Sequence, residues 1–202
     1  MVNTKDSHPE GDAGPDPDGG RRAELVHAAV DYVEAHGIAD LSLRGLGAAI
    51  GTSHRMLIHY FGSKEELLVE IVRAAEQRQR DLLTRLRVEP GLSPTEASRL
   101  LWQQLTDPRL DGQERLFFEI CGNALRGRPE AVPVLDGLVN DWLDLLAAPE
   151  TAAGTDPVVA RNRARLGLAT VRGLLLDLLA TGDRAGVDAA MEEFLLLYYG
   201  PE

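Results

Sequence analysis

Apolar residues recur along most of the chain at spacings of three and four, the repeat of an α-helix that buries one face. Leu25, Ala29 and Val33 follow this spacing before Gly37, and glycine commonly stands just after the end of a helix. Signals for strands are weak, since β-branched runs are absent and aromatic residues make up only 5% of the chain. The pattern predicts an all-α protein.

Helix-starting residues divide this pattern into segments. Ser42 and Ser53 precede two short apolar-periodic segments, and Ser63 and Ser93 each begin a Ser-x-x-Glu capping box. The residues PETAAGTD, at 149–156, are typical of a loop. Together these signals predict about nine helices and no sheet, over residues 21–36, 43–50, 53–60, 63–87, 94–107, 112–126, 130–147, 157–181 and 183–199.

Composition separates the two ends of the chain. Residues 1–20 are rich in Gly, Pro and Asp, which predicts a disordered tail. Residues 21–66 hold the first three predicted helices and residues 67–202 the larger remainder. No stretch approaches the roughly 18 apolar residues of a membrane span, and the N-terminus lacks the apolar segment of a secretory signal. We therefore expect a cytoplasmic protein that makes no membrane contact.

The net charge of −11 at first argues against a partner as acidic as DNA. Its distribution changes that conclusion, because residues 1–20 carry −4, residues 21–80 are neutral and residues 81–202 carry −7. Within residues 41–64 the only formal charges are those of Arg44, Arg55 and Lys64. A cationic segment on an acidic body suits a small DNA-reading module whose nonspecific binding the body limits.

The two short helices predicted at 43–50 and 53–60, joined at Gly51-Thr52, have the dimensions of a helix-turn-helix. The major groove of B-DNA admits one α-helix, whose exposed side chains can read the base edges. The helical spacing turns Leu57 and Phe61 inward. It leaves four side chains of the second helix facing outward: His54, Arg55, Ile58 and His59.

A longer string makes a family resemblance specific. The segments LVHAAVDYVEAHG and LSLRGLGAAIGTSHRMLIHYFGSKEELL, within residues 24–72, are similar to the DNA-binding domain of the TetR family of regulators. The likeness includes the Leu-Ser-x-Arg start of the second helix, Gly51 at the turn and the Leu-x-x-Tyr-Phe end of the third helix. It implies a TetR-type domain over 21–66 and a helical ligand-binding and dimerisation domain over 67–202. The implied function is a repressor that a small-molecule ligand releases from a near-palindromic, double-stranded DNA operator.

The resemblance also implies roles for single residues. Ser42 would contact a phosphate, and Arg44 would reach a phosphate or a base edge. Tyr60 would bind a phosphate through its hydroxyl, and Lys64 would attract another together with the helix N-terminus beside it. The positions of the recognition helix are Thr52, Ser53, His54, Arg55, Met56, Ile58 and His59.

Three of these residues depart from the common family pattern. Many members have Gly or Pro where Arg55 stands, Thr in place of Met56 and Tyr in place of Ile58. Arg55 could donate two hydrogen bonds to a guanine. Met56 and Ile58 could contact thymine methyl groups or pack inward. The departures leave the operator sequence open, but not the docking mode.

The C-terminal segment ATVRGLLLDLLATGDRAGVDAAMEEFLLL is similar to the closing helix pair of many TetR-like proteins, which usually forms a four-helix bundle with its twin. Small residues on the first of these helices would let two helices approach closely, although an intramolecular core face would show the same pattern. The implied homodimer interface comprises Leu166, Ala169, Thr170, Gly173, Leu174, Asp177, Met191, Phe194, Leu195 and Tyr198.

A ligand pocket is expected among the fourth to eighth helices, because the scarce large aromatic side chains cluster there. Each of them taken singly suits ordinary core packing equally well. Glu119 could offer a charge to a cationic ligand or lie in solvent. Cys121, the only cysteine, excludes an intramolecular disulfide and is either a packing residue or a sensing thiol. The candidate lining residues are Trp102, Phe117, Phe118, Cys121, Leu138 and Trp142.

Sequence motifs of enzymes are absent, including Gly-rich phosphate loops, HExxH, paired cysteines and GxSxG. The spacing of His54 and His59 is poor for one helix face. We therefore expect no catalytic residue, no metal and no cofactor. Two alternatives remain, an activator or architectural protein with the same domain and a helical adaptor that no longer binds DNA. Weaker DNA binding at higher salt would separate the first from the second.

Overall fold

The computed structural model describes residues 17–38 and 41–200, and within these ranges the regular elements are α-helices and two short 3₁₀ turns. This confirms the prediction of an all-α protein. The elements are α1 (Pro17–His36), α2 (Leu43–Ala49), α3 (His54–Phe61), α4 (Lys64–Val88), α5 (Pro94–Leu105), η1 (Pro108–Leu110), α6 (Asp111–Leu125), η2 (Val132–Leu135), α7 (Asn140–Ala152), α8 (Pro157–Thr181) and α9 (Arg184–Tyr199).

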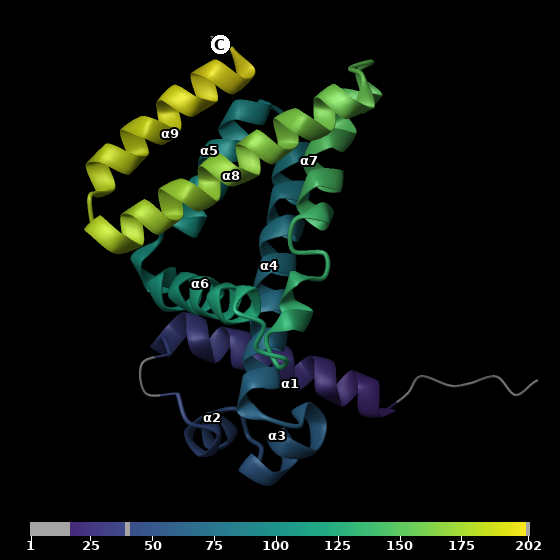
Figure 1. Ribbon diagram of the computed structural model, residues 1–202, viewed down its shortest axis with the longest axis vertical. Helices are drawn as coiled ribbons and strands as arrows, with labels where there is room; N and C mark the ends of the chain where they lie inside the picture. The colour runs from purple at the N-terminus through teal and green to yellow at the C-terminus, as the bar shows by residue number, and fades with distance from the viewer. Residues whose placement is uncertain (1–16, 39–40, 201–202) are drawn as a thin grey trace, which may run out of the picture.

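The long helix α4 connects the two halves of the molecule (Figure 1). Its first turns pack with α1 and α3, and its later turns pack with α5 and α7. Helix α6 lies across the middle and contacts α1 as well as α4. Helices α8 and α9 form an antiparallel pair at the far end from α2 and α3 (Figure 1). Helix α4 therefore contacts elements of both halves of the molecule.

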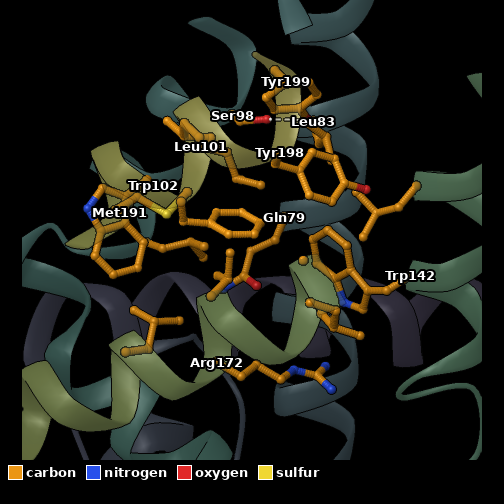
Figure 2. A pocket seen from close by; sticks show the side chains of 18 of the residues that line it. Gln79, Leu83, Ser98, Leu101, Trp102, Trp142, Arg172, Met191, Tyr198 and Tyr199 are labelled. Carbon is orange, nitrogen blue, oxygen red and sulfur yellow. Dashed lines mark hydrogen bonds between the residues drawn. The ribbon is translucent and has the colours of Figure 1, made fainter. Parts of the chain in front are cut away.

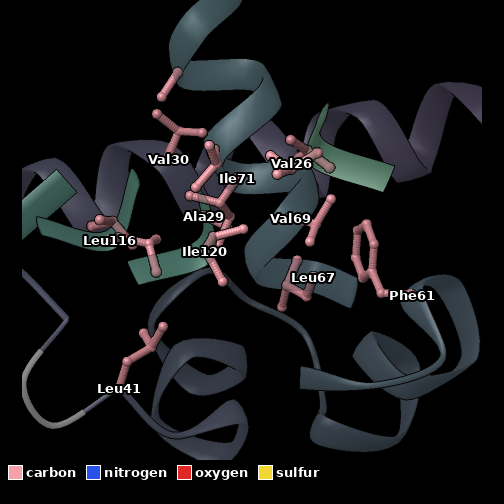
Figure 3. Close-up of a cluster of buried hydrophobic side chains, with 14 of the residues drawn as sticks. Val26, Ala29, Val30, Leu41, Phe61, Leu67, Val69, Ile71, Leu116 and Ile120 are labelled. Atoms are coloured by element: carbon pink, nitrogen blue, oxygen red, sulfur yellow. The ribbon is translucent and has the colours of Figure 1, made fainter. Parts of the chain in front are cut away.

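The core of the N-terminal half extends beyond the three helices that the sequence assigns to it. Leu57 and Phe61 of α3 are buried with Val33 of α1, and Leu116 and Ile120 of α6 complete the same cluster (Figure 3). Because α6 lies in the predicted C-terminal domain, the two predicted domains share one apolar core. Burying these side chains stabilises the junction between the domains as well as each of them.

A second core lies among the later turns of α4 and helices α5, α7, α8 and α9. Leu83, Leu143 and Leu195 are its most deeply buried leucines. None of the helices in the part of the chain that the structure describes is long and apolar enough to cross a membrane.

The predicted N-caps are confirmed. The hydroxyls of Ser42, Ser53, Ser63 and Ser93 each accept a hydrogen bond from the backbone amide three residues later. At Ser93 the reciprocal bond from the backbone amide to Glu96 completes a capping box, and this hydrogen bonding lowers the pKa of the Glu96 carboxyl. At Ser63 the glutamate instead accepts from the serine hydroxyl. Four helices therefore begin where the sequence predicts.

Helix α1 begins at Pro17, four residues before its predicted start, and residues 1–16 of the predicted tail lie outside the described residues. The larger difference concerns α7, which was expected over 130–147 and is found over 140–152. Pro133 leads into a 3₁₀ turn and Gly137 has a positive φ of 75°, so a continuous helix cannot start at residue 130.

Pro149 lies inside α7, although the sequence predicts a loop from that residue onward. A proline has no amide hydrogen, so the carbonyl of Leu145, four residues earlier, loses its helical donor. Arg87 of α4 supplies a replacement, because its Nη1 donates to the Leu145 oxygen at 2.9 Å. This tertiary contact lets the helix continue to Ala152.

Candidate DNA-binding surface and ligand cavity

The turn between α2 and α3 depends on two glycines. Gly51 has a φ of 72°, in the left-handed region that other residues rarely adopt. Gly47 faces the turn from α2, where a Cβ atom would lie 3.1 Å from the Thr52 carbonyl oxygen and 3.2 Å from the His54 nitrogen. Sequence reasoning identified Gly51 and missed Gly47. The close packing of backbone on backbone fixes the angle at which α3 leaves the turn.

Helix α3 divides into a buried and an exposed face, as predicted. Leu57 and Phe61 are buried, while His54, Arg55 and His59 are exposed. Met56 is 39% exposed and Ile58 half-buried, so Met56 is open to a partner and Ile58 only partly so. The exposed face is the one that a groove of DNA would meet.

The segment that forms this face contains no acidic residue, since Asp and Glu are absent from residues 41–64. Arg44 and Ser42 are exposed at the start of α2, and Ser53 is exposed beside α3. Within the described residues, neither Arg44 nor Arg55 forms an ion pair. Both guanidinium groups are therefore available to phosphates or base edges.

Lys64 has a further partner that the sequence did not indicate. Its Nζ donates to the carbonyl oxygen of Leu41 at 2.6 Å and so ties the first residue of α4 to the segment that enters α2. The predicted phosphate contact would have to use the remaining hydrogens of this ammonium. Tyr60 and Thr52 are half-buried, and the Tyr60 ring packs edge-on against His59 at a centroid distance of 5.3 Å.

A cavity of about 80 Å³ lies in the C-terminal half. Figure 2 shows Trp102 and Trp142 on opposite sides of it, with Gln79 reaching in between them. Apart from four polar side chains, its walls are apolar or aromatic. The lining residues are Glu76, Gln79, Leu83, Ser98, Leu101, Trp102, Leu105, Trp142, Leu146, Gly167, Leu168, Val171, Arg172, Leu175, Met191, Phe194, Leu195, Tyr198 and Tyr199.

Two of the six predicted lining residues, Trp102 and Trp142, border this cavity. The other four, Phe117, Phe118, Cys121 and Leu138, do not and instead belong to or pack against the N-terminal core. The prediction was wrong for the three residues of α6 because this helix packs them against the core shared with α1 and α4, and it was wrong for Leu138 because the segment before α7 packs against the same core. Burial raises the pKa of the Cys121 thiol to about 11, so it stays protonated near neutral pH, which favours the packing interpretation. Glu119 is exposed.

One end of the cavity is polar. Glu76 is 8% exposed, and its Oε2 accepts from Trp142 Nε1 at 2.7 Å and from Arg172 Nη2 at 3.0 Å. The same Arg172 nitrogen donates to the Leu138 carbonyl at 3.0 Å. Gln79 Nε2 donates at 2.9 Å to Glu114, whose pKa is raised to about 7 by burial and by the nearby charge of Glu76.

The other end is closed by hydrogen bonds between helices. The hydroxyls of Ser98 on α5 and Tyr199 on α9 bond at 2.9 Å, and Trp102 Nε1 donates to Asp188 at 2.8 Å. Burial, with the charge of Glu150, raises the pKa of the Tyr198 hydroxyl. These contacts join α5 to α9 over the cavity.

The predicted dimer residues fall into two groups. On α8, Leu166, Ala169, Gly173 and Asp177 are exposed and Thr170 and Leu174 are half-buried. On α9, Met191 and Leu195 are only 2% and 1% exposed, and Phe194 and Tyr198 are half-buried at the cavity. Met191 and Leu195 are therefore core residues and not interface residues. The exposed apolar side chains that sequence reasoning missed are Leu176, Leu196 and Leu197.

The fold and the surface around α3 together define a helix-turn-helix protein with a helical body. Residues 25–71 match the model of the bacterial regulatory proteins of the tetR family. The chain is 37% identical over 54 residues to the HTH-type transcriptional regulator BetI of Agrobacterium fabrum and 30% identical over 81 residues to BetI 1 of Chromohalobacter salexigens. These matches cover 27% and 40% of this chain and 26% and 40% of the relatives, so they concern the N-terminal part alone.

Solved structures match over nearly the whole chain. A transcriptional regulator from Rhodococcus sp. Rha1 has a TM-score of 0.65 at 22% identity and covers 88% of this chain and 95% of its own. The multidrug binding protein EbrR, solved with imidazole, has a TM-score of 0.61 at 26% identity, with coverage of 95% and 97%. The match over residues 25–71 and these likenesses support a transcriptional regulator with an N-terminal DNA-binding domain of the tetR type.

Proposed function

We propose that the protein is a sequence-specific, DNA-binding repressor that acts as a homodimer in the cytoplasm and leaves its operator when a small molecule binds. The observation that carries the DNA part is the surface of α3, where His54, Arg55 and His59 are exposed, together with exposed Arg44 on α2, which forms no ion pair within the described residues. Such a surface suits the major groove, where side chains read base edges and phosphates fix the register.

The small-molecule part rests on the cavity and on what lines it. EbrR has been solved in complex with imidazole and with proflavin, and its fold covers nearly the whole of this chain. The cavity of about 80 Å³ is smaller than the roughly 150 Å³ cavity that holds a benzene molecule. An aromatic ligand would therefore have to push the surrounding helices apart, and it would favour a wider form of the protein.

Helix α4 would carry that widening to the DNA surface. Glu76, Gln79 and Leu83 line the cavity on α4, and the same helix begins beside α3. Ion pairs from Arg22 to Glu70 and from Arg78 to Asp31 tie α1 to α4. A tilt of α4 would thus change the separation of the two recognition helices in the dimer, which must be close to one turn of DNA, roughly 34–36 Å.

A second path would run through α6. A Cβ atom on Gly112, at the start of α6, would lie 2.7 Å from the Cα of Gly37, just beyond α1. This close approach leaves α6 no room to move without moving the segment between α1 and α2. Ligand and DNA would then bind different arrangements of the same helices, which is what a coupling between two sites requires.

The test is fluorescence anisotropy on the DNA that flanks the protein's own gene. We expect salt-sensitive, nanomolar binding to one fragment over scrambled DNA. The variant Arg55→Ala should lose about tenfold or more in affinity, the range for one base-contacting arginine. The matched control is Arg128→Ala, which removes the same charge from an exposed loop beyond α6. Equal, weak binding to all sequences would favour an architectural protein, and no binding would favour an adaptor.

A further inference from the structure

The walls of the cavity indicate the shape of its ligand. Five aromatic side chains line it, from the three helices α5, α7 and α9. Aromatic rings pack best against other flat rings in offset or edge-to-face arrangements. Gly167 leaves space beside two of them, since a Cβ atom there would come within 3.5 Å of Tyr198 and 3.6 Å of Phe194. A flat aromatic body suits these walls better than a branched or flexible one.

The polar end of the cavity presents two acceptor oxygens that no donor among the described residues satisfies. Both hydrogen bonds to Glu76 fall on Oε2, and within the described residues its Oε1 accepts none. The Nε2 of Gln79 donates a hydrogen bond to Glu114. The Oε1 of the same amide therefore points elsewhere and, like Glu76 Oε1, accepts no hydrogen bond from the described residues. Both side chains line the cavity. A carboxylate that is 8% exposed with one oxygen unpaired calls for a donor from a ligand.

The charges at this end favour a cation over an anion. The carboxylate of Glu76 is paired with the guanidinium of Arg172, whose Nη2 also bonds the Leu138 carbonyl. Glu114 lies behind Gln79 with a pKa of about 7, so it adds part of a negative charge near neutral pH. Arg172 also lies over the Phe117 ring at 5.0 Å, which holds it away from the cavity centre. Arg80 approaches Trp142 at 5.9 Å and pairs with Asp141, so it is engaged as well.

We propose that the effector is a flat aromatic compound with a cationic N–H donor group, such as an aryl amidine, whose N–H groups bond Glu76 Oε1 and Gln79 Oε1. Its ring lies between Trp102 and Trp142 and against Phe194. The proposal rests on the proposed function, because it names the ligand of the same cavity. A carboxylate-bearing ligand would meet the charge of Glu76 and the acceptor oxygen of Gln79 at this end, and it is disfavoured there.

The test compares three naphthalenes that differ in one substituent: 2-naphthamidine, which is a cationic donor, 2-naphthamide, which is neutral, and 2-naphthoate, which is an anionic acceptor. Isothermal titration calorimetry on the full chain measures each affinity without DNA. We expect the amidine to bind at least tenfold more tightly than the naphthoate, with the amide between them. Naphthoate binding as tightly as the amidine, or no binding by any of the three, would overturn the proposal.

Substitutions locate the contact. Glu76→Gln would leave Arg172 without its anion and risks misfolding, so Gln79→Met is the informative variant. It should weaken the amidine about tenfold and leave the naphthoate unchanged, because only the amidine loses a hydrogen bond. The control is Gln77→Met, an exposed neighbour on α4 outside this cavity. An unchanged amidine affinity in Gln79→Met would contradict the assigned contact.

The same samples separate this proposal from the proposed function. If the amidine binds and the protein does not bind DNA at any salt concentration, the repressor function is contradicted and the proposed ligand class is supported. If the protein binds its operator and only the naphthoate releases it, the function stands and the ligand class fails. If both hold, the amidine should release the operator DNA, and Gln79→Met should require about tenfold more of it.

Discussion

Glu114 is a carboxyl group that the fold buries without a cation of its own. It is 4% exposed, and its hydrogen bonds come from the neutral amides of Gln79 and Gln113. The neighbouring Arg172 bonds Glu76 instead, and the negative charge of Glu76 further disfavours ionisation of Glu114. Burial is the largest cause of its raised pKa, and the hydrogen bond from Gln79 opposes it.

A raised pKa of this kind makes stability depend on pH. The pKa of Glu114 is about 7 in the folded chain, against 4.5 for an unperturbed glutamate. Well below pH 4.5 the Glu114 carboxyl is protonated in both the folded and the unfolded chain, so its ionisation does not lower the free energy of unfolding. As the pH rises to 7 the unfolded state loses its proton first, so the free energy of unfolding falls, by an upper value of about 3 kcal/mol.

Replacing Glu114 by Gln should remove this loss. We expect Glu114→Gln to raise the free energy of unfolding clearly at pH 8 and much less at pH 5, as measured by urea unfolding at both values. The exposed neighbour Glu119→Gln, on the same helix, should change stability little at either pH. An equal gain in the free energy of unfolding at pH 5 and pH 8 would contradict the raised pKa, because the Glu114 carboxyl would then carry the same charge at both pH values.

Helix α7 shows what can and cannot be predicted at the scale of an element. Caps such as Ser42 and Ser93 are local signals, and the helices that they start were predicted to within a residue or two. The passage of α7 through Pro149 depends on Arg87, which is 58 positions away from the carbonyl that it bonds. No local pattern contains that contact.

The candidate site divides in the same way. The surface of α3 follows from its own helical spacing and from a resemblance over adjacent residues, so Arg55 and His59 were placed on its exposed face. The cavity is assembled from α4, α5, α7, α8 and α9, and its lining depends on how these helices are rotated. The spacing of Met191 and Leu195 on α9 is the same for a dimer interface and for an intramolecular core. Their burial in the folded chain shows that they belong to the core.

The role of Arg87 can be tested with a double-mutant cycle. Arg87→Met keeps the length of the side chain but leaves the Leu145 carbonyl without a donor, which should lower the free energy of unfolding by about 1 kcal/mol. In a Pro149→Ala background the new amide can bond the same carbonyl, so the cost of Arg87→Met should shrink. Urea unfolding measures both, and Arg85→Met, exposed on the same helix, is the control. Equal costs in the two backgrounds would show that Arg87 acts elsewhere.

At the scale of the whole molecule, the proposed function gives the two ends of α4 different partners. Its start holds the DNA surface through Lys64 and Leu41, and its middle lines the cavity through Glu76 and Gln79. The shared core between α1, α4 and α6 prevents the two halves from moving independently. Widening of the cavity therefore has to appear at the helix-turn-helix, provided that a second copy fixes the far end of the molecule.

That second copy should dock on α8 and α9. Leu166 and Leu176 on α8 are 66% and 52% exposed, and Leu196 and Leu197 on α9 are 52% and 85% exposed. Neighbouring Ala169 and Gly173 are exposed too and would let the helices of two copies approach closely. Exposed leucines gathered on one helix pair are typical of a buried contact between chains.

We expect the double variant Leu166→Glu, Leu197→Glu to be monomeric in sedimentation equilibrium, because four glutamates would meet in the dimer interface without cations. Its affinity for a full operator should fall by tenfold or more, while a half-site should bind as weakly as before, since one recognition helix remains intact. The control is Leu125→Glu, at a side chain that is 78% exposed at the end of α6. A double variant that stays dimeric would place the interface on another face, and the effect of Leu125→Glu would then show whether the end of α6 belongs to it.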